Sequence, residues 1–330
     1  MKKLFNLVCF AVIAGCLGIT GTYVTMDYSP GVEAGAAQSA SQVDDDGLQE
    51  EAAQNEAEKA GEAASEAAQN EGIEGAASSG SAAQSTAAQV SAPQISASGA
   101  ILIDGESGEV LYELDADRQL MPASTTKIMT ALVVLEICDE LDVGLDSEVV
   151  VPQEAEGVEG SSMYLKGGEK VTIERLLYGL MLQSGNDAAK TLAICMGGTE
   201  EKFVERMNVT AADIGCSGTN FVNPHGLSDE NHYTTARDLA LIAQEAMKRE
   251  DFRQIVGVQQ WEDIYNKNKT VHQYEGGNGV KIGYTQASGR TLVASAERDG
   301  KTLIAVVLND GNWFNDAYSL LDYGFARKEQ

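Results

Sequence analysis

Hydrophobic positions recur at two different spacings from about residue 99 to the end of the chain. Spacings of three and four residues, which place apolar side chains on one helix face, occupy the middle of this region. Shorter apolar or alternating runs, typical of strands, lie near its two ends. The helical spacing predicts helices over about 124–141, 171–183, 186–196, 200–215, 235–249 and 314–326. The shorter runs predict strands over about 100–104, 109–114, 258–265, 269–274, 290–297 and 302–309.

This order of elements predicts an α/β fold of the α+β type. Strands at both ends with helices between them indicate one antiparallel sheet, flanked by helices that also form a helical subdomain. Two local signals sharpen the prediction. The stretch "RDGK" at 298–301 favours a tight hairpin, because Asp-Gly suits a type I′ turn. Thr172 is an expected cap near the start of the second helix.

The first residues have the pattern of an export signal. Lys2 and Lys3 precede a mostly apolar run over 4–14, which ends in "IAGC" with Cys16 as its last residue. Small residues before a cysteine are typical of a bacterial lipobox, in which Cys16 would be lipidated. The alternatives are an uncleaved anchor over 1–24 and plain secretion. All three predict an extracytoplasmic protein, tethered to the cell membrane through its N-terminus or secreted if cleaved.

A second segment, 25–98, differs in composition from the rest. It is rich in Ala, Glu, Gln, Ser and Gly, has no aromatic residue from 33 onward, and contains "EAAQNE" at 51–56 and 66–71. Such a segment cannot bury enough apolar surface to fold by itself. We therefore expect a disordered linker over 25–98 that tethers a folded domain spanning 99–330.

Charge and residue counts exclude several classes of site. A formal net charge of -27 argues against a nucleic-acid partner, because no basic face could neutralise phosphates. The three histidines form no zinc-binding pattern, so no metal site is expected. Beyond the first residues the chain has three cysteines, an odd number: Cys138, Cys195 and Cys216. They permit either one disulfide between Cys195 and Cys216 or three buried thiols.

A serine and a lysine near the predicted start of the first helix are the first candidates for chemistry. Ser124 and Lys127 are three residues apart in "MPASTTKIMTALVVL", so both side chains lie on one helix face. A serine needs a base to act as a nucleophile, and a lysine whose pKa is lowered by burial can be that base. The alternative is an ordinary serine cap beside a surface lysine.

Two further stretches contribute polar groups. In "MLQSGNDAAK", Ser184 and Asn186 lie where one predicted helix ends and the next begins, so they form either a helix–helix turn or part of a cleft. In "GVKIGYT" at 279–285, just before a predicted strand, Lys281 can attract a carboxylate. Gly283 permits another backbone to approach closely. The alternative there is a surface lysine beside a turn glycine.

Taken together, Ser-x-x-Lys, Ser-x-Asn and Lys-x-Gly in this order resemble the serine penicillin-recognising enzymes. Over about 99–327 the chain is similar to D-alanyl-D-alanine carboxypeptidases of the low-molecular-mass penicillin-binding type. The stretches that carry this resemblance include "SGNDAAKTLA", "FVNPHGL", "HYTTARDLALIA", "GVKIGYT" and "LVASAERDGKTLIAVVL".

The resemblance implies a β-lactamase/DD-peptidase-like fold and a cleft between sheet and helical subdomain. It implies that Ser124 attacks the carbonyl between two D-alanines of a peptidoglycan stem peptide, while Lys127 takes its proton. Ser184 and Asn186 would assist proton transfer and hold the substrate. Lys281 would supply positive charge near the substrate's terminal carboxylate, and Gly283 would belong to the same substrate-binding stretch. Backbone N–H groups of Ser124 and Tyr284 would bind the oxyanion. β-Lactams are the implied inhibitors, and no cofactor is needed.

Two departures from the family pattern concern the substrate carboxylate. Position 282 is isoleucine where the family usually has threonine, and a lost hydrogen bond to a charged group costs about 1.5–3 kcal/mol. Isoleucine bulk could also narrow the slot. The stretch after the strand near 308 lacks the arginine of some members, and Arg290 is a possible substitute. The alternative to an active carboxypeptidase is therefore an impaired member that binds cell wall or regulates. A β-lactamase is disfavoured because we find no Glu-x-x-x-Asn-type segment that would supply a deacylating glutamate.

Overall fold

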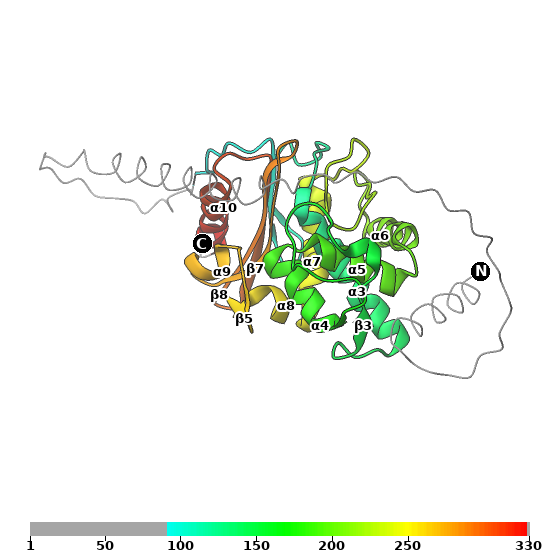
Figure 1. Cartoon of the computed structure of the whole chain (residues 1–330). Coiled ribbons are helices and arrows are strands. Elements are labelled where there is room, and N and C mark those ends of the chain that lie inside the picture. The colour runs from blue at the N-terminus through cyan, green and yellow to red at the C-terminus, as the bar shows by residue number, and fades with distance from the viewer. Residues whose placement is uncertain (1–90, 329–330) are drawn as a thin grey trace, which may run out of the picture. The chain divides into compact units, whose positions relative to one another are not determined.

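The computed structural model describes residues 91–328. Their centre is a five-stranded antiparallel sheet with the order β2-β1-β9-β8-β7 (Figure 1). The sheet combines strands from both ends of the domain, as the sequence predicts. Its strands are β1 (Gly99–Asp104), β2 (Val110–Leu114), β7 (Gly277–Thr285), β8 (Gly289–Arg298) and β9 (Lys301–Leu308).

The two faces of the sheet bury different residues, because side chains alternate along each strand. Leu102 belongs to a cluster with Leu320 and Leu321 of α10 (Trp313–Lys328). Its neighbour Ile101 belongs to the larger cluster on the other face, together with the central helices. Figure 1 shows α10 on one side of the sheet and α3, α5 and α7 on the other. The predicted helix-flanked sheet is confirmed.

The helical layer follows the predicted pattern closely. The predicted helix over 124–141 is a 3₁₀ turn followed by α3, and the one over 171–183 is split into a short helix and a π-helical turn. The layer consists of η1 (Ala123–Thr126), α3 (Lys127–Leu141), α4 (Ile173–Tyr178), η3 (Gly179–Gln183), α5 (Asn186–Gly197), α6 (Glu200–Ile214), α7 (Ala236–Lys248) and α8 (Glu250–Gly257). Of these, α8 was not predicted. Thr172 caps α4, where its hydroxyl accepts from Arg175 N at 3.1 Å.

Three strand predictions differ from the structure. The run over 269–274 forms a helical turn, α9 (Thr270–Gln273), because the side chain of Asn268 accepts from Thr270 N at 3.0 Å and starts a helix. The run over 258–265 is broken into β5 (Gln260–Trp261) and β6 (Ile264–Tyr265). Residues 279–285 do not precede a strand but belong to β7. The sequence also gave no sign of β3 (Glu148–Val150), of η2 (Gln153–Ala155) or of β4 (Lys170–Thr172).

The hairpin between β8 and β9 has the predicted turn. Asp299 and Gly300 have φ values of 50° and 72°, as a type I′ turn requires at both central positions. Arg298 and Lys301 form the last paired positions on either side. The short connection fixes the register of the two longest central strands.

The first described residues already contact the domain. Ser96 N donates to Asp316 Oδ2 at 2.6 Å, and Ser96 Oγ lies 2.6 Å from Asp310 Oδ1 and 2.9 Å from Asp316 Oδ2. Ala97 is buried as well. The packed part therefore begins a few residues before Gly99, within the segment predicted as linker.

The expected signal, Cys16 and most of the linker lie outside the described residues. The disulfide considered between Cys195 and Cys216 is not formed: Cys195 Sγ donates to Val150 O at 3.5 Å, and Cys216 is a half-buried thiol. Cys138 is a buried thiol. No helix within 91–328 is long and apolar enough to cross a bilayer.

Candidate active site

Ser124 lies in η1, the 3₁₀ turn that leads directly into α3. The N-cap of this turn is Pro122, so Ser124 does not cap the helix. Its Oγ instead lies 3.0 Å from Nζ of Lys127, on the same face one turn later. Ala123, just before the serine, has a left-handed φ of 49°. Backbone strain of this kind gathers at functional sites, and here it sets the direction in which the chain enters the turn.

Lys127 is fully buried, with 0% of its surface exposed. Its Nζ donates to Asn186 Oδ1 at 2.7 Å and to the carbonyl oxygen of His225 at 2.6 Å. A neutral amine has two N–H groups and one lone pair. Because Asn186 and His225 accept the two N–H groups, the lone pair is left to face the hydroxyl of Ser124. The sequence alternative of a solvent-facing lysine is excluded.

Burial also makes the neutral form accessible. Desolvation, followed by the positive charge of Lys281, holds the pKa of Lys127 well below 10.5, although Asp187 acts in the opposite direction. A lysine with a lowered pKa, within hydrogen-bond reach of a serine hydroxyl, has the arrangement of a general base and its nucleophile.

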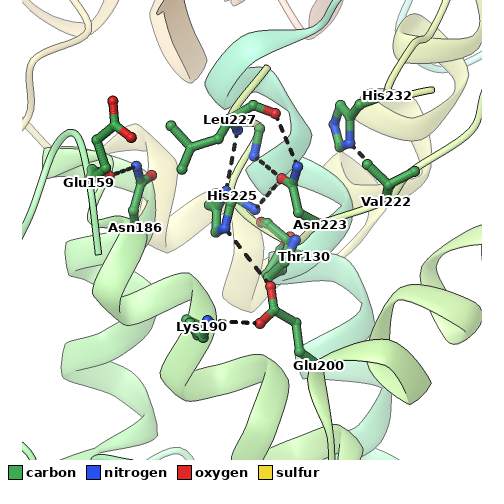
Figure 2. Close-up of polar contacts among 12 residues, drawn as sticks. Thr130, Glu159, Asn186, Lys190, Glu200, Val222, Asn223, His225, Leu227 and His232 are labelled. Carbon is green, nitrogen blue, oxygen red and sulfur yellow. Dashed lines mark hydrogen bonds and ion pairs between the residues drawn. The ribbon is translucent and has the colours of Figure 1, made fainter. Parts of the chain in front are cut away.

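The carbonyl that accepts from Lys127 belongs to the loop "FVNPHGL" at 221–227, a stretch that carries the family resemblance but held no candidate site residue. In this loop, Nδ1 of His225 accepts a hydrogen bond from Leu227 N at 3.2 Å (Figure 2). The ring proton of His225 therefore lies on Nε2, and this atom is 3.9 Å from Glu200 Oε1. Burial lowers the pKa of His225 to about 3, so the ring is neutral. Every residue has a backbone oxygen, so the sequence could not show that the one at His225 accepts from Lys127.

Gly226 explains how this loop approaches the serine so closely. A Cβ on Gly226 would lie 1.9 Å from the carbonyl oxygen of Ala123, and its φ is +89°. Only glycine fits both requirements. The "HGL" stretch thus packs directly against the turn that contains Ser124. Gly226 was the one residue in the sequence that could have indicated this close approach.

Ser184 and Asn186 enter the site from the helical side. Ser184 follows the π-helical turn η3 at a left-handed φ of 67° and is 5% exposed. Asn186 begins α5, and its Nδ2 donates to the carbonyl of Glu159 at 2.6 Å (Figure 2). With its Oδ1 held by Lys127, Asn186 connects the base to the loop that contains Glu159. The turn therefore lies beside Lys127, and the expectation that it lines a cleft stays a prediction.

The opposite wall is β7, an edge strand of the sheet. A Cβ on Gly283 would lie 2.8 Å from Ser124 N and 2.5 Å from Thr291 Oγ1. The glycine therefore permits the close backbone approach that the sequence predicted. Tyr284, the next residue, is 47% exposed.

Lys281 supplies a buried cation on the same strand. It is 1% exposed and its Nζ donates to Ile282 O at 2.9 Å. Burial, followed by the charge of Lys267, lowers its pKa to about 7. The sequence alternative of a surface lysine is excluded, and Lys267, which sequence reasoning missed, adds positive charge nearby.

The two departures from the family pattern have clear positions. Ile282 is half-buried and packs against the cluster that contains Leu320 and Leu321 of α10. Arg290 is paired with Tyr284 across the strands, but its guanidinium lies 6.0 Å from the Trp313 ring and donates weakly to Gly311 O at 3.5 Å.

The assembled groups are of the types that acyl transfer by a serine requires. The hydroxyl of Ser124, the buried amine of Lys127 and the amide of Asn186 are joined by hydrogen bonds, and the buried Lys281 lies close enough to affect the pKa of Lys127. Within residues 91–328, no cluster of three or more His, Cys, Asp or Glu side chains is arranged to hold a metal ion.

Comparison with known proteins gives consistent results. Residues 86–312 match the family described as D-alanyl-D-alanine carboxypeptidase. DacF of Bacillus subtilis, a D-alanyl-D-alanine carboxypeptidase, is 35% identical over 71% of this chain and 63% of its own length. DacB2 of Mycobacterium tuberculosis, of the same description, is 36% identical over 70% of this chain and 82% of its own.

Solved structures agree with these relatives. The crystal structure of the Streptomyces K15 DD-transpeptidase aligns with a TM-score of 0.68 and 34% identity, covering 72% of this chain and 100% of that one. A D-alanyl-D-alanine carboxypeptidase from Mycobacterium tuberculosis aligns with a TM-score of 0.67 and 34% identity, covering 73% and 95%. The chain nevertheless spans only 63% of DacF and 60% of DacC of Escherichia coli.

Proposed function

The chain belongs to the D-alanyl-D-alanine carboxypeptidase family, and from this premise we propose that it is a serine-type carboxypeptidase. It would remove the terminal D-alanine from peptidoglycan stem peptides through an acyl-enzyme. One observation carries the proposal: the fully buried Lys127 has its Nζ 3.0 Å from Ser124 Oγ and its remaining donors engaged elsewhere.

Acylation follows from this geometry. Lys127 Nζ takes the proton of Ser124 as Oγ attacks the carbonyl carbon between the two D-alanines. The negative charge that develops on the carbonyl oxygen would be bound by the backbone N–H groups of Ser124 and Tyr284. Collapse of the tetrahedral intermediate expels D-alanine, and the proton carried by Lys127 passes to the leaving amine. Ser184 is the proposed relay for that proton.

Deacylation uses the same groups in reverse order. Once Lys127 is neutral again, it can accept a proton from a water that attacks the acyl carbon. The serine then leaves with that proton, and the shortened stem peptide is released. Asn186 holds the peptide amide next to the serine throughout, and no cofactor takes part in any step.

Recognition of the substrate's free carboxylate rests on Lys281. In its charged form it faces the carboxylate from the sheet side. The hydroxyl usual at position 282 is missing, so one hydrogen bond to the carboxylate is lost. Ile282 therefore supports a second candidate: a catalytically impaired family member that binds stem peptides and acts as a wall-binding or regulatory protein.

The N-terminal segment supplies the proposed location. Residues 1–24 have an export-signal pattern and Cys16 stands at a lipobox-like position, which supports an extracytoplasmic protein tethered to the membrane. Labelling with a lipid precursor, lost in Cys16→Ser, tests the lipidation. Membrane association that is unchanged in Cys16→Ser would favour the uncleaved anchor.

The full chain should be incubated with a fluorescent penicillin and with diacetyl-Lys-D-Ala-D-Ala. An active carboxypeptidase is labelled and releases D-alanine, and both signals vanish in Ser124→Ala. Labelling without release favours the impaired member. Absence of labelling and of release in the wild-type chain contradicts the proposed enzyme.

A further inference from the structure

A loop over 159–165 is fastened to the first turn of α5 by a single buried carboxylate. Asp187, 1% exposed, accepts from Ser162 Oγ at 2.7 Å and from the backbone nitrogens of Met163 and Leu165, each at 3.0 Å. Charge-assisted hydrogen bonds of this kind are the strong ones. The loop is therefore held rigidly at the residue next to Asn186.

Met163 seats the loop against the turn that carries the polar groups of the site. A Cβ on Gly179 would lie 1.9 Å from Met163 Sδ, and a Cβ on Gly185 would lie 3.0 Å from Met163 Cγ. The methionine thus fills space that both glycines leave. Since Gly185 separates Ser184 from Asn186, and Asn186 Nδ2 donates to Glu159 O, the loop over 159–165 borders the candidate active site, and we call this loop the rim.

The next residue points the other way. Tyr164 is 78% exposed, and its φ is 61°. A bulky residue at positive φ is a rare outlier. Apart from glycine, aspartate and asparagine, the described residues with positive φ are Ala123, Tyr164, Ser184 and Glu262. Two of the other three, Ala123 and Ser184, belong to the site itself.

The hydrogen bonds to Asp187 explain the backbone at this position but not the tyrosine ring. Glycine or asparagine would adopt the same φ with less strain. An exposed ring gains little from folding, because it stays in water. A ring kept on a rigid, strained position at the rim of a cleft is positioned to meet a ligand.

The substrate offers one segment at the required place. The proposed reaction acts on the last two residues of a stem peptide, so the residues directly before them must leave the cleft over its rim. Glycan is further away along the covalent chain. Tyrosine suits such a contact, since its ring gives a rigid apolar face and its hydroxyl stays hydrated.

We propose that Tyr164 is a specificity-determining residue that contacts the stem peptide on the N-terminal side of the D-Ala-D-Ala unit. This inference rests on the proposed function and names the part of its substrate that the rim recognises. Contacts remote from the reacting carbonyl help to align it, so the ring favours longer peptides over the bare dipeptide.

The test compares two substrates in three full-length proteins. Wild type, Tyr164→Asn and Tyr164→Phe are assayed with N-acetyl-D-Ala-D-Ala and with a complete pentapeptide stem. Asparagine tolerates the left-handed backbone, so the loop is kept while the ring is lost. We expect Tyr164→Asn to lower kcat/KM for the pentapeptide about tenfold, with less than about a twofold change for the dipeptide. Tyr164→Phe should retain the preference for the pentapeptide.

A second readout separates this inference from the proposed function. Binding of the pentapeptide to Ser124→Ala, measured by calorimetry, should weaken about tenfold when Tyr164→Asn is added. Wild-type chain that neither reacts with penicillin nor releases D-alanine overturns the proposed function, while this binding measurement still tests the tyrosine. The role of Tyr164 is overturned if Tyr164→Asn lowers kcat/KM equally for both substrates. It is also overturned if this substitution leaves the pentapeptide affinity of Ser124→Ala unchanged.

Discussion

A Cβ atom on Gly283 would lie 2.8 Å from the backbone nitrogen of Ser124, so the edge strand and the serine turn approach each other backbone to backbone. No side chain separates them at this point. The distance between the sheet and the helical layer at Ser124 therefore depends on the absence of a Cβ atom at position 283.

Replacing this glycine tests how narrowly the site is built. Gly283→Ala should lower the rate of penicillin acylation about 100-fold, because displacing a reacting group by about 1 Å costs that much. The matched control is Gly311→Ala, whose added Cβ meets no atom within 4 Å and should leave the rate unchanged. Stopped-flow labelling measures both. Equal rates in wild type and Gly283→Ala would contradict the close approach.

The pH dependence of kcat/KM should be bell-shaped. Lys127 acts as a base only when neutral, so the rate falls as pH drops below its lowered pKa. Lys281 attracts the carboxylate only when charged, so the rate also falls as pH rises above about 7, the pKa of this lysine. D-Alanine release across pH gives the profile.

Lys281→Arg should remove the basic limb of that profile, because a guanidinium stays charged throughout the range. The acidic limb should stay where it is, since it belongs to Lys127. A basic limb that persists near 7 in Lys281→Arg would show that another group causes it.

Ile282→Thr restores a hydroxyl beside Lys281. If this hydroxyl reaches the substrate carboxylate, kcat/KM for diacetyl-Lys-D-Ala-D-Ala should rise about 10- to 100-fold. Ile282→Val, which removes apolar volume but adds no hydroxyl, is the control. A rate for the threonine variant equal to that of the valine variant contradicts our account of position 282.

The buried carboxyl pair at the start of α10 predicts a pH effect on stability. Asp310 is 1% exposed, and burial raises its pKa above 3.8, with Asp316 adding to the shift. When the pKa of a carboxyl is higher in the folded state than in the unfolded state, its contribution to stability is fully present below the unfolded-state pKa. This contribution is lost as pH rises through the folded-state pKa. Asp310→Asn cannot ionise, so its Tm relative to wild type should be higher at pH 8 than at pH 3.5. An equal difference at both pH values would argue against the shift.

The contact between Ser124 and Lys127 could be predicted because it is local. Ser124 and Lys127 meet through helical spacing alone, whereas Lys281 joins them only through a strand that closes the sheet. That third residue was found through the order of motifs, which depends on the family resemblance. The group at His225 that accepts a hydrogen bond from Lys127 is a backbone oxygen. Every residue type has such an oxygen, so the sequence could not identify it.

The fold predictions failed where short polar signals overrode apolar runs. Residues 269–274 read as a strand, yet Asn266 and Asn268 accept from backbone nitrogens two residues further on and start a helical turn. The break between β5 and β6 coincides with Glu262, whose φ is 48°. Side-chain competition for backbone donors, rather than hydrophobic periodicity, decided the segment over 269–274, and a turn at 262–263 divided the segment over 258–265.

The position of Ser96 also has a mechanical consequence. Its hydrogen bonds to Asp310 and Asp316 tie the entry of the domain to the junction of β9 and α10. A pulling force applied through the residues before Ser96 acts on these hydrogen bonds before it acts on β1. The force is then shared with the β9–α10 junction, so the hydrogen bonds between β1 and its neighbouring strands do not break one after another.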